Sequence, residues 1–316
     1  MRTYIVVWYI FLIFSIVLSF HCQRGEEAGD GRPTIALIVK TLNHPFFIDM
    51  QNGAEEAASK CGVNLIVQGA EREVDVEKQM QIIENLIQRK VDALCVAPSG
   101  SKEIVPAILK ANKAGIPVLT VDTRVDTVVL NEAGGRVETF IGSDNFEGGK
   151  IAGKCIIERL GGRGKVAILE GIPGHETGDA RLRGFQEAVD KESEIEVVAS
   201  LTANWERDQG FNVFQNILQS HPEVRALFAC NDLMALGAIE AIAAAGRTGE
   251  IVVVGFDAIE DGRDAIRKGT MEGSVAQHPY EMGKQAIENA YRLINEEEIK
   301  AYNPVKIELI TLENVN

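Results

Sequence analysis

Short apolar runs rich in β-branched residues alternate with amphipathic segments from residue 34 to the C-terminus. Runs of this length and composition predict β-strands, and the amphipathic segments between most of them predict helices. The predicted strands are residues 34–40, 64–69, 93–98, 117–122, 139–144, 165–171, 196–201, 226–232, 251–257, 273–277 and 305–311. Residues 76–90 and 232–246 are two of the predicted helices, and the second ends on a glycine, as helices commonly do.

The predicted strands are almost continuously apolar, which is typical of parallel sheets covered by helices on both faces. Right-handed crossovers then give doubly wound sheets. The pattern runs to about residue 143 and starts again, and a single sheet of ten or more strands would be unusually large. The sequence therefore predicts an α/β fold with two doubly wound parallel-sheet domains. In such folds a ligand binds beyond the carboxyl ends of the strands.

The first predicted strand runs into the stretch KTLNHPFFIDM, residues 40–50. A dinucleotide-binding fold carries a glycine-rich phosphate loop at this point. This stretch has no glycine before Gly53 and offers Lys40, His44, Phe46 and Phe47 instead. We therefore expect a ligand that is not held through a pyrophosphate.

Polar and aromatic side chains also stand at the other predicted strand ends in both halves of the chain. They are Asp122, Thr123, Arg181, Trp205, Asn231, Asp257 and Gln277. Carboxylates accept hydrogen bonds from sugar hydroxyls, arginine donates in a planar fork, and amides do both. Aromatic faces pack against the C–H groups of a sugar ring. This combination favours a neutral polyhydroxylated ligand.

Each of these residues also has a purely structural explanation. An aspartate at a strand end is often a helix cap, which suits Asp144 and Asp232. One of Phe46 and Phe47 is expected in the core, and His44 fits a turn before a proline. The joint placement at strand ends in both halves is what favours a binding site.

The composition narrows the function classes. The 316 residues suffice for two domains, and the net charge of −14 argues against nucleic acid as a partner. The sequence has no nucleophile elbow, Walker A, zinc-protease or EF-hand motif. We therefore expect no enzymatic activity, no cofactor and no metal. Four scattered cysteines lack metal-ligand spacing, namely Cys61, Cys95, Cys155 and Cys230. Inert buried thiols are the expectation, and a disulfide in an oxidising compartment stays open, since the sequence does not pair them.

The N-terminus looks like an export signal. Residues 4–20 are almost wholly apolar and follow a single Arg2, and the polar stretch 23–32 reads as a flexible linker. Cys22 directly follows the apolar run, as in a bacterial lipoprotein signal, although Phe20 and His21 stand where small residues are usual. Three interpretations stay open: a lipoprotein anchored through Cys22, a secreted protein, and an uncleaved anchor. All place the remaining chain outside the cytoplasm, and membrane contact is expected only through this N-terminal segment.

Over residues 34–316 the chain resembles the periplasmic ribose- and allose-binding proteins, the solute-binding subunits of ABC sugar importers. The resemblance rests on KTLNHPFFIDM, GSDNFEGGKIAG (142–153), GDARLRGF (178–185), TANWERD (202–208), VVVGFDAIEDG (252–262) and SVAQHP (274–279). The allose-binding members look closer than the ribose-binding ones through Lys40, residues 133–135 and Trp205.

The resemblance implies the type I periplasmic binding protein fold. Two domains, residues 33–143 with 278–305 and residues 144–277 with 306–316, would be joined by hinge segments near Ser143, His278 and Lys306; residues 1–22 would be the signal. Phe46, Phe47 and Trp205 would hold the faces of a sugar ring. Lys40, Asp122, Arg181, Asn231, Asp257 and Gln277 match the family's polar ligands.

Two positions depart from the family pattern. His44 stands where the family usually has asparagine. Thr123 stands where ribose binders have arginine and allose binders have glutamate. Both positions touch sugar hydroxyls in relatives, so a pyranose aldohexose, a ketohexose and a smaller polyol all remain candidate ligands.

We therefore expect a monomeric extracytoplasmic protein that binds a monosaccharide and delivers it to ABC permease subunits by hinge closure. One alternative is a sensing module that feeds a chemoreceptor or a sensor kinase. Another is the effector-binding core of a lac-repressor-type regulator. Such regulators carry an N-terminal helix-turn-helix, but here that position holds the apolar segment.

Overall fold

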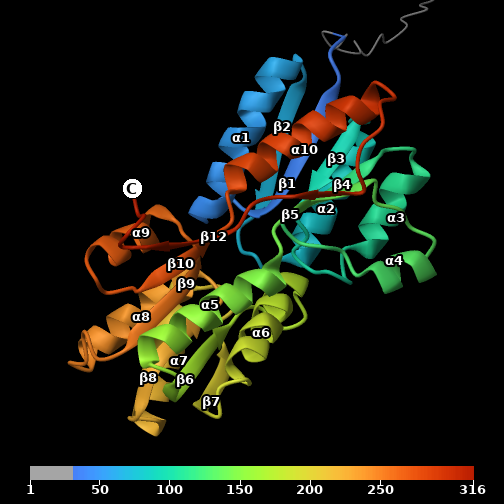
Figure 1. Ribbon diagram of the computed structural model, residues 1–316. Coiled ribbons are helices and arrows are strands. Elements are labelled where there is room, and N and C mark those ends of the chain that lie inside the picture. Colours follow the sequence, from blue (N-terminus) through green and yellow to red (C-terminus); the bar gives the residue numbers. More distant parts are fainter. Residues whose placement is uncertain (1–30) are drawn as a thin grey trace, which may run out of the picture. The chain divides into compact units, whose positions relative to one another are not determined.

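The computed structural model describes residues 31–316 (Figure 1). The predicted signal segment, Cys22 and the linker up to residue 30 lie outside the described residues. Residues 33–316 form one compact unit. Within residues 31–316, no helix has both the length and the apolar character needed to cross a membrane.

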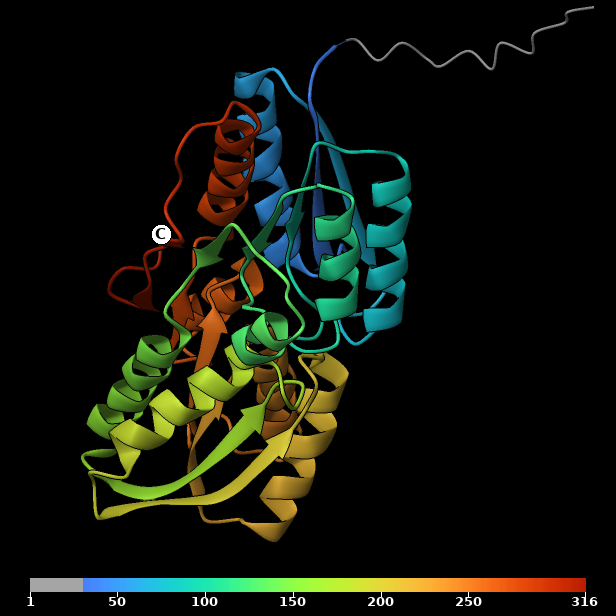
Figure 2. The same cartoon turned by 90° about the vertical axis from the view of Figure 1, so that its right-hand side faces the viewer.

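The first sheet has six strands, all paired in parallel. Their spatial order is β11 (Tyr302–Pro304), β5 (Thr139–Gly142), β4 (Val118–Val121), β3 (Ala93–Val96), β1 (Thr34–Thr41) and β2 (Asn64–Ala70). The helices that accompany this sheet are α1 (Pro45–Cys61), α2 (Val76–Gln88), α3 (Val105–Lys113), α4 (Thr127–Glu132) and α10 (Pro279–Ile294) (Figures 1 and 2).

The second sheet repeats this arrangement. Its order is β12 (Glu308–Thr311), β10 (Gly273–Ala276), β9 (Val252–Asp257), β8 (Val224–Ala229), β6 (Arg163–Glu170) and β7 (Glu194–Thr202). Its helices are α5 (Asn145–Leu160), α6 (Glu176–Val189), α7 (Arg207–Ser220), α8 (Asp232–Ala244) and α9 (Glu260–Arg267). All pairs are parallel except β10 with β12, which is antiparallel. The predicted α/β fold of two parallel-dominated sheets is confirmed.

Strand β1 shows why these runs are apolar throughout. Ile35 and Leu37 belong to the core cluster that contains Met50 of α1, whereas Ala36 and Ile38 belong to the cluster that contains residues of α2. Successive side chains point to opposite faces of a sheet, so helices on both faces require apolar residues at every position. The prediction of doubly covered sheets followed from this requirement.

Only residues 308–311 of the predicted strand 305–311 form a strand, and a separate short strand precedes it at residues 302–304. Residues 302–304 form β11 beside β5 in the first sheet, and residues 308–311 form β12 beside β10 in the second. Between them the Val305 N–H donates to the Gly142 carbonyl at 3.1 Å. The chain thus passes from one sheet to the other three times, after β5, after β10 and after β11.

Helices α5 and α6 pack with their backbones almost in contact. A β-carbon added to Gly149 would lie 2.0 Å from the Arg181 carbonyl oxygen, and one added to Gly184 would lie 1.9 Å from that of Phe146. Only glycine permits so close an approach. This contact determines where α6 presents Arg181.

The cysteines of the described region, Cys61, Cys95, Cys155 and Cys230, are free. Burial raises the pKa of the Cys95, Cys155 and Cys230 thiols to about 12. A thiol in that state is a poor nucleophile, because the thiolate is the reactive form.

Candidate ligand-binding site

Residues at the carboxyl ends of strands from both sheets enclose a pocket with an empty volume of about 290 Å³. Its lining consists of Lys40, His44, Phe46, Phe47, Glu73, Asp122, Thr177, Arg181, Trp205, Asn231, Asp257 and Gln277. Every one of these residues is at most 8% exposed. An enclosed space of this size favours a small molecule as the ligand.

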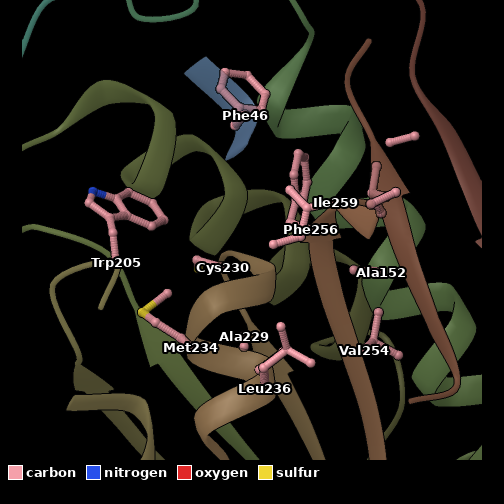
Figure 3. Packing of buried hydrophobic residues seen from close by; sticks show 14 of the residues in the cluster. Phe46, Ala152, Trp205, Ala229, Cys230, Met234, Leu236, Val254, Phe256 and Ile259 are labelled. Atoms are coloured by element: carbon pink, nitrogen blue, oxygen red, sulfur yellow. The ribbon is translucent and has the colours of Figure 1, made fainter. Parts of the chain in front are cut away.

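The start of α1 supplies one aromatic wall. His44 is the N-cap of this helix, and its Nδ1 accepts a hydrogen bond from the Phe46 backbone N–H at 3.1 Å. The rings of Phe46 and Phe47 meet edge to face, with centroids 5.2 Å apart. Figure 3 shows Phe46 at the top and Trp205, which follows β7, at the left.

Lys40, near the end of β1, lines another part of the pocket on the side of the first sheet. It lies at a β-bulge, where the pairing of β1 with β2 changes register between Val39 and Thr41, and bulges re-aim side chains. Its Nζ is 3.1 Å from Asp122 Oδ2 and 3.9 Å from Glu73 Oε2. All three side chains are buried, so the ammonium stands between two carboxyl groups that water screens poorly.

Arg181 of α6 is held from the second-sheet side. Its Nε donates to Asn145 Oδ1 at 2.8 Å, and one terminal nitrogen donates to the Cys230 carbonyl at 2.6 Å. The same nitrogen is 3.6 Å from Asp257 Oδ1, and the guanidinium stacks 3.8 Å from the centroid of Phe256. These contacts fix the plane of the guanidinium before any ligand arrives.

The amides have structural partners as well. Asn231 caps α8, since its Oδ1 accepts from the Met234 N–H at 2.9 Å while its Nδ2 donates to the Trp205 carbonyl at 3.1 Å. Gln277 donates to Asp257 Oδ1 at 2.7 Å, and its own Oε1 is buried with no hydrogen-bond partner among residues 31–316. A buried unpaired acceptor favours a ligand hydroxyl as its partner.

Burial also changes the protonation of the site. It lowers the pKa of His44 to about 4, with a further lowering by the charge of Lys40, so the imidazole is neutral. Burial raises the pKa of Glu73 to about 7 and that of Asp257 to about 6, while the charges of Lys40 and Arg181 respectively oppose the rise. No group of acidic, cysteine or histidine side chains within residues 31–316 has an arrangement suited to a metal ion.

Three pocket residues have strained backbones. Asp122, Trp205 and Asp257 have φ angles of 61°, 67° and 100°, in the region that side-chain-bearing residues rarely adopt. Each of these residues stands at the carboxyl end of a strand. Such strain persists where the surrounding structure imposes it, and it is concentrated at functional sites.

The model of the periplasmic binding protein domain family matches residues 35–298. The chain belongs to this family. It is 38% identical to the ribose import binding protein of Escherichia coli (strain K12), over 95% of this chain and 96% of that protein. It is 38% identical to the D-allose-binding periplasmic protein of the same strain, over 78% of this chain and 80% of that protein.

A solved structure of the same family has the same fold. It is an ABC transporter periplasmic solute-binding protein from Actinobacillus succinogenes 130z with bound D-allose. The TM-score is 0.86 at 40% identity, and the match covers 90% of this chain and 99% of that one.

The structure brings together ten of the eleven residues that the sequence singled out for the binding site of this periplasmic binding protein. Thr123 is the exception, because it is fully buried beside the pocket and its hydroxyl donates to Asp122 Oδ2 at 2.8 Å. In this position Thr123 orients a pocket carboxylate. The binding role of all eleven residues stays a prediction.

Sequence reasoning missed two lining residues, Glu73 and Thr177. Glu73 lies in the charged stretch EREVD, residues 71–75, just beyond a predicted strand. The expectation that ligand residues follow strand ends pointed to this stretch. It did not indicate which of its carboxyl groups, that of Glu73, lines the pocket. Thr177 lies in the first turn of α6, four residues before Arg181.

Proposed function

We propose that the protein binds a neutral monosaccharide in this pocket, outside the cytoplasm, and delivers it to the permease of an ABC importer. One observation carries the proposal: a small pocket between the two sheets combines aromatic rings with two cations and three carboxyl groups, all almost fully buried. The relatives, a ribose import protein and a D-allose-binding protein, support a sugar as the ligand and import as the purpose. The proposal assigns no catalytic step.

The route into the pocket requires the two sheets to separate, because its lining is buried. We propose that the three passages between the sheets, near Ser143, His278 and Lys306, act as hinges. A ligand shifts such an equilibrium only if it binds the closed state better. A sugar held by both sheets meets this condition, and the closed form would present a continuous surface to the permease.

Among the candidate sugars, allose-like hexoses have the most direct support. The A. succinogenes protein was solved with D-allose. Lys40 and Trp205 favour the same class by resemblance, whereas His44 and Thr123 depart from it. We propose a pyranose hexose as the first candidate, with pentoses, ketohexoses and polyols next. The lipid anchor at Cys22 is likewise a proposal and concerns residues outside the described region.

A panel of aldoses, ketoses and polyols tests the function, with Trp205 fluorescence and thermal melting as readouts. We expect at least one sugar to change the fluorescence of the wild type, and the change to disappear in Trp205→Phe. A sugar at 100 times its Kd should stabilise the fold by about 2.7 kcal/mol. Absence of both signals across the whole panel would refute sugar binding.

A further inference from the structure

Glu73 is the carboxyl group of the pocket whose ionised form has the fewest stabilising contacts. It extends from the connection between β2 and α2, and it is 8% exposed. Among residues 31–316 its single ion-pair partner is Lys40, at 3.9 Å. No hydrogen bond joins its carboxyl group to any other residue among those the structure describes. An ionised carboxylate that is buried without hydrogen bonds is costly, and it tends to take up a proton instead.

Asp122 competes with Glu73 for Lys40 from a shorter distance. Its Oδ2 lies 3.1 Å from the Lys40 ammonium and also accepts the Thr123 hydroxyl at 2.8 Å. Asp122 therefore makes two close contacts through its carboxylate, and Glu73 makes one longer contact. Of the two carboxyl groups around Lys40, Glu73 is the one that geometry leaves to carry a proton.

The charge count of the pocket leads to the same assignment. Lys40 and Arg181 balance Asp122 and Asp257, so a neutral Glu73 leaves the pocket without net charge. A neutral sugar would displace water from the pocket side of the carboxyl group, and this desolvation would further disfavour ionisation. The raised pKa of Glu73, about 7 with burial as its main cause, agrees with this direction.

We propose that Glu73 contacts the bound sugar as a neutral carboxylic acid, and that sugar binding takes up a proton from solvent whenever the open protein holds Glu73 ionised. A carboxylic acid donates one hydrogen bond and still accepts others, so Glu73 would pair with a sugar oxygen that the carboxylates cannot serve. This inference rests on the proposed sugar-binding function and adds a proton linkage to it.

The sign of the effect follows from the two states. Closure around the sugar removes water, so Glu73 has a higher pKa in the closed form than in the open form. The contribution of the Glu73 proton to sugar affinity is complete below the pKa that Glu73 has in the open form. It is lost as pH rises through the pKa that Glu73 has in the closed form. Affinity should therefore fall on the alkaline side.

Other charged groups also face Glu73 or the chamber beside it. Lys40, Asp122, Asp257 and Glu206 act on its charge, and His44 shares its wall. Glu73 also borders an adjoining open chamber, which Glu71, Arg72 and Asp208 line as well. The pKa values of His44 and Asp257 are about 4 and about 6, below the pH range in which Glu73 would titrate. The pH range from 6.5 to 8.5 therefore separates Glu73 from His44. The comparison with Glu73→Gln separates it from Asp257 and from the buried Asp232, whose pKa burial raises to about 8.

The test is titration calorimetry with the best sugar of the panel at several pH values in that range. We expect the Kd of the wild type to rise at least about threefold, and by no more than about tenfold per pH unit for one proton. Glu73→Gln, a mimic of the neutral acid, should show no alkaline loss of affinity over the same range. Glu77→Gln, an exposed neighbour on α2, should keep the wild-type pH dependence.

A second measurement needs no variant. Wild-type binding at pH 7.5 in two buffers of different ionisation enthalpy should show net proton uptake. A wild-type affinity that is constant with pH, or a Glu73→Gln protein that keeps the alkaline loss, would overturn the inference and leave sugar binding intact. If no sugar binds at any pH, the proposed function itself fails.

Discussion

His44 shows how one residue can serve both the fold and the site. Its Nδ1 caps α1 through the Phe46 N–H, so the neutral ring carries its proton on Nε2. The imidazole can then only donate to a ligand. The family's asparagine offers the same two functions, a capping oxygen and a donating nitrogen, on a shorter side chain. Histidine and asparagine at this position therefore differ in how far the donating nitrogen extends into the pocket.

The substitution His44→Asn should separate these two roles. Asparagine keeps the cap, so we expect the melting temperature to change little. The donor retreats from the pocket, so the ranking of sugars in the panel should change. His44→Ala removes both functions and should also lose about 1 kcal/mol of stability with the cap. An unchanged sugar ranking in His44→Asn would show that this position does not select the sugar.

At the scale of elements, the pocket depends on how closely helices pack. Arg181 projects from α6, and α6 is positioned by its backbone contact with α5 at Gly149 and Gly184. Asn145, the first residue of α5, accepts the hydrogen bond that orients Arg181. The α5–α6 pair thus acts as one unit that aims a single guanidinium.

Gly149→Ala should disturb that aim. Its new β-carbon would lie 2.0 Å from the Arg181 carbonyl, so the helices must move apart, at a cost of about 1–3 kcal/mol. We expect a lower melting temperature together with weaker sugar binding. Gly115→Ala is the control, because its φ of 75° makes alanine unfavourable by about 1 kcal/mol while the added carbon meets no neighbour. It should lower stability and leave affinity unchanged; equal affinity loss in both would contradict a positioning role.

At the scale of the whole molecule, binding is a balance between contacts made across the two sheets and the freedom lost on closure. One such contact lies apart from the pocket lining. The backbone N–H of Glu176, at the start of α6, donates to Ser101 Oγ at 3.2 Å. Ser101 belongs to the segment between β3 and α3, so this hydrogen bond joins the two halves of the protein.

Ser101→Ala should therefore weaken the binding of every sugar by a similar factor. The lost hydrogen bond leaves an N–H without its partner, a cost of about 1 kcal/mol or roughly fivefold in Kd. The ranking of the panel should stay the same, since the contact does not touch the ligand. Calorimetry across the panel measures this, and Ser220→Ala, an exposed serine at the end of α7, is the control. A change confined to one sugar would place Ser101 in the site instead.

The sequence by itself determined the elements and most of the lining residues. Continuous apolar runs require cover on both faces, which predicts doubly covered sheets, and the carboxyl ends of parallel strands share one edge. The expectation that ligand residues follow strand ends therefore singled out Lys40 in the first sheet and Gln277 in the second, and the resemblance to binding proteins implied that both belong to one site. The resemblance to binding proteins indicated that His44 and Thr123 differ from the residues usual at these positions. It did not indicate where their side chains lie.

Only the tertiary structure decided which polar groups turn inward. Glu73 and its charged neighbours look alike in the sequence, and Thr123 looks like a ligand until its hydroxyl is seen to bond Asp122. The sequence likewise predicted one strand at residues 305–311, whereas β11 (302–304) joins the first sheet and β12 (308–311) joins the second. These outcomes depend on a bulge at Lys40, on backbone φ angles of 61° to 100° at strand ends, and on charges brought together from distant segments. Such features arise from long-range packing, which local periodicity does not encode.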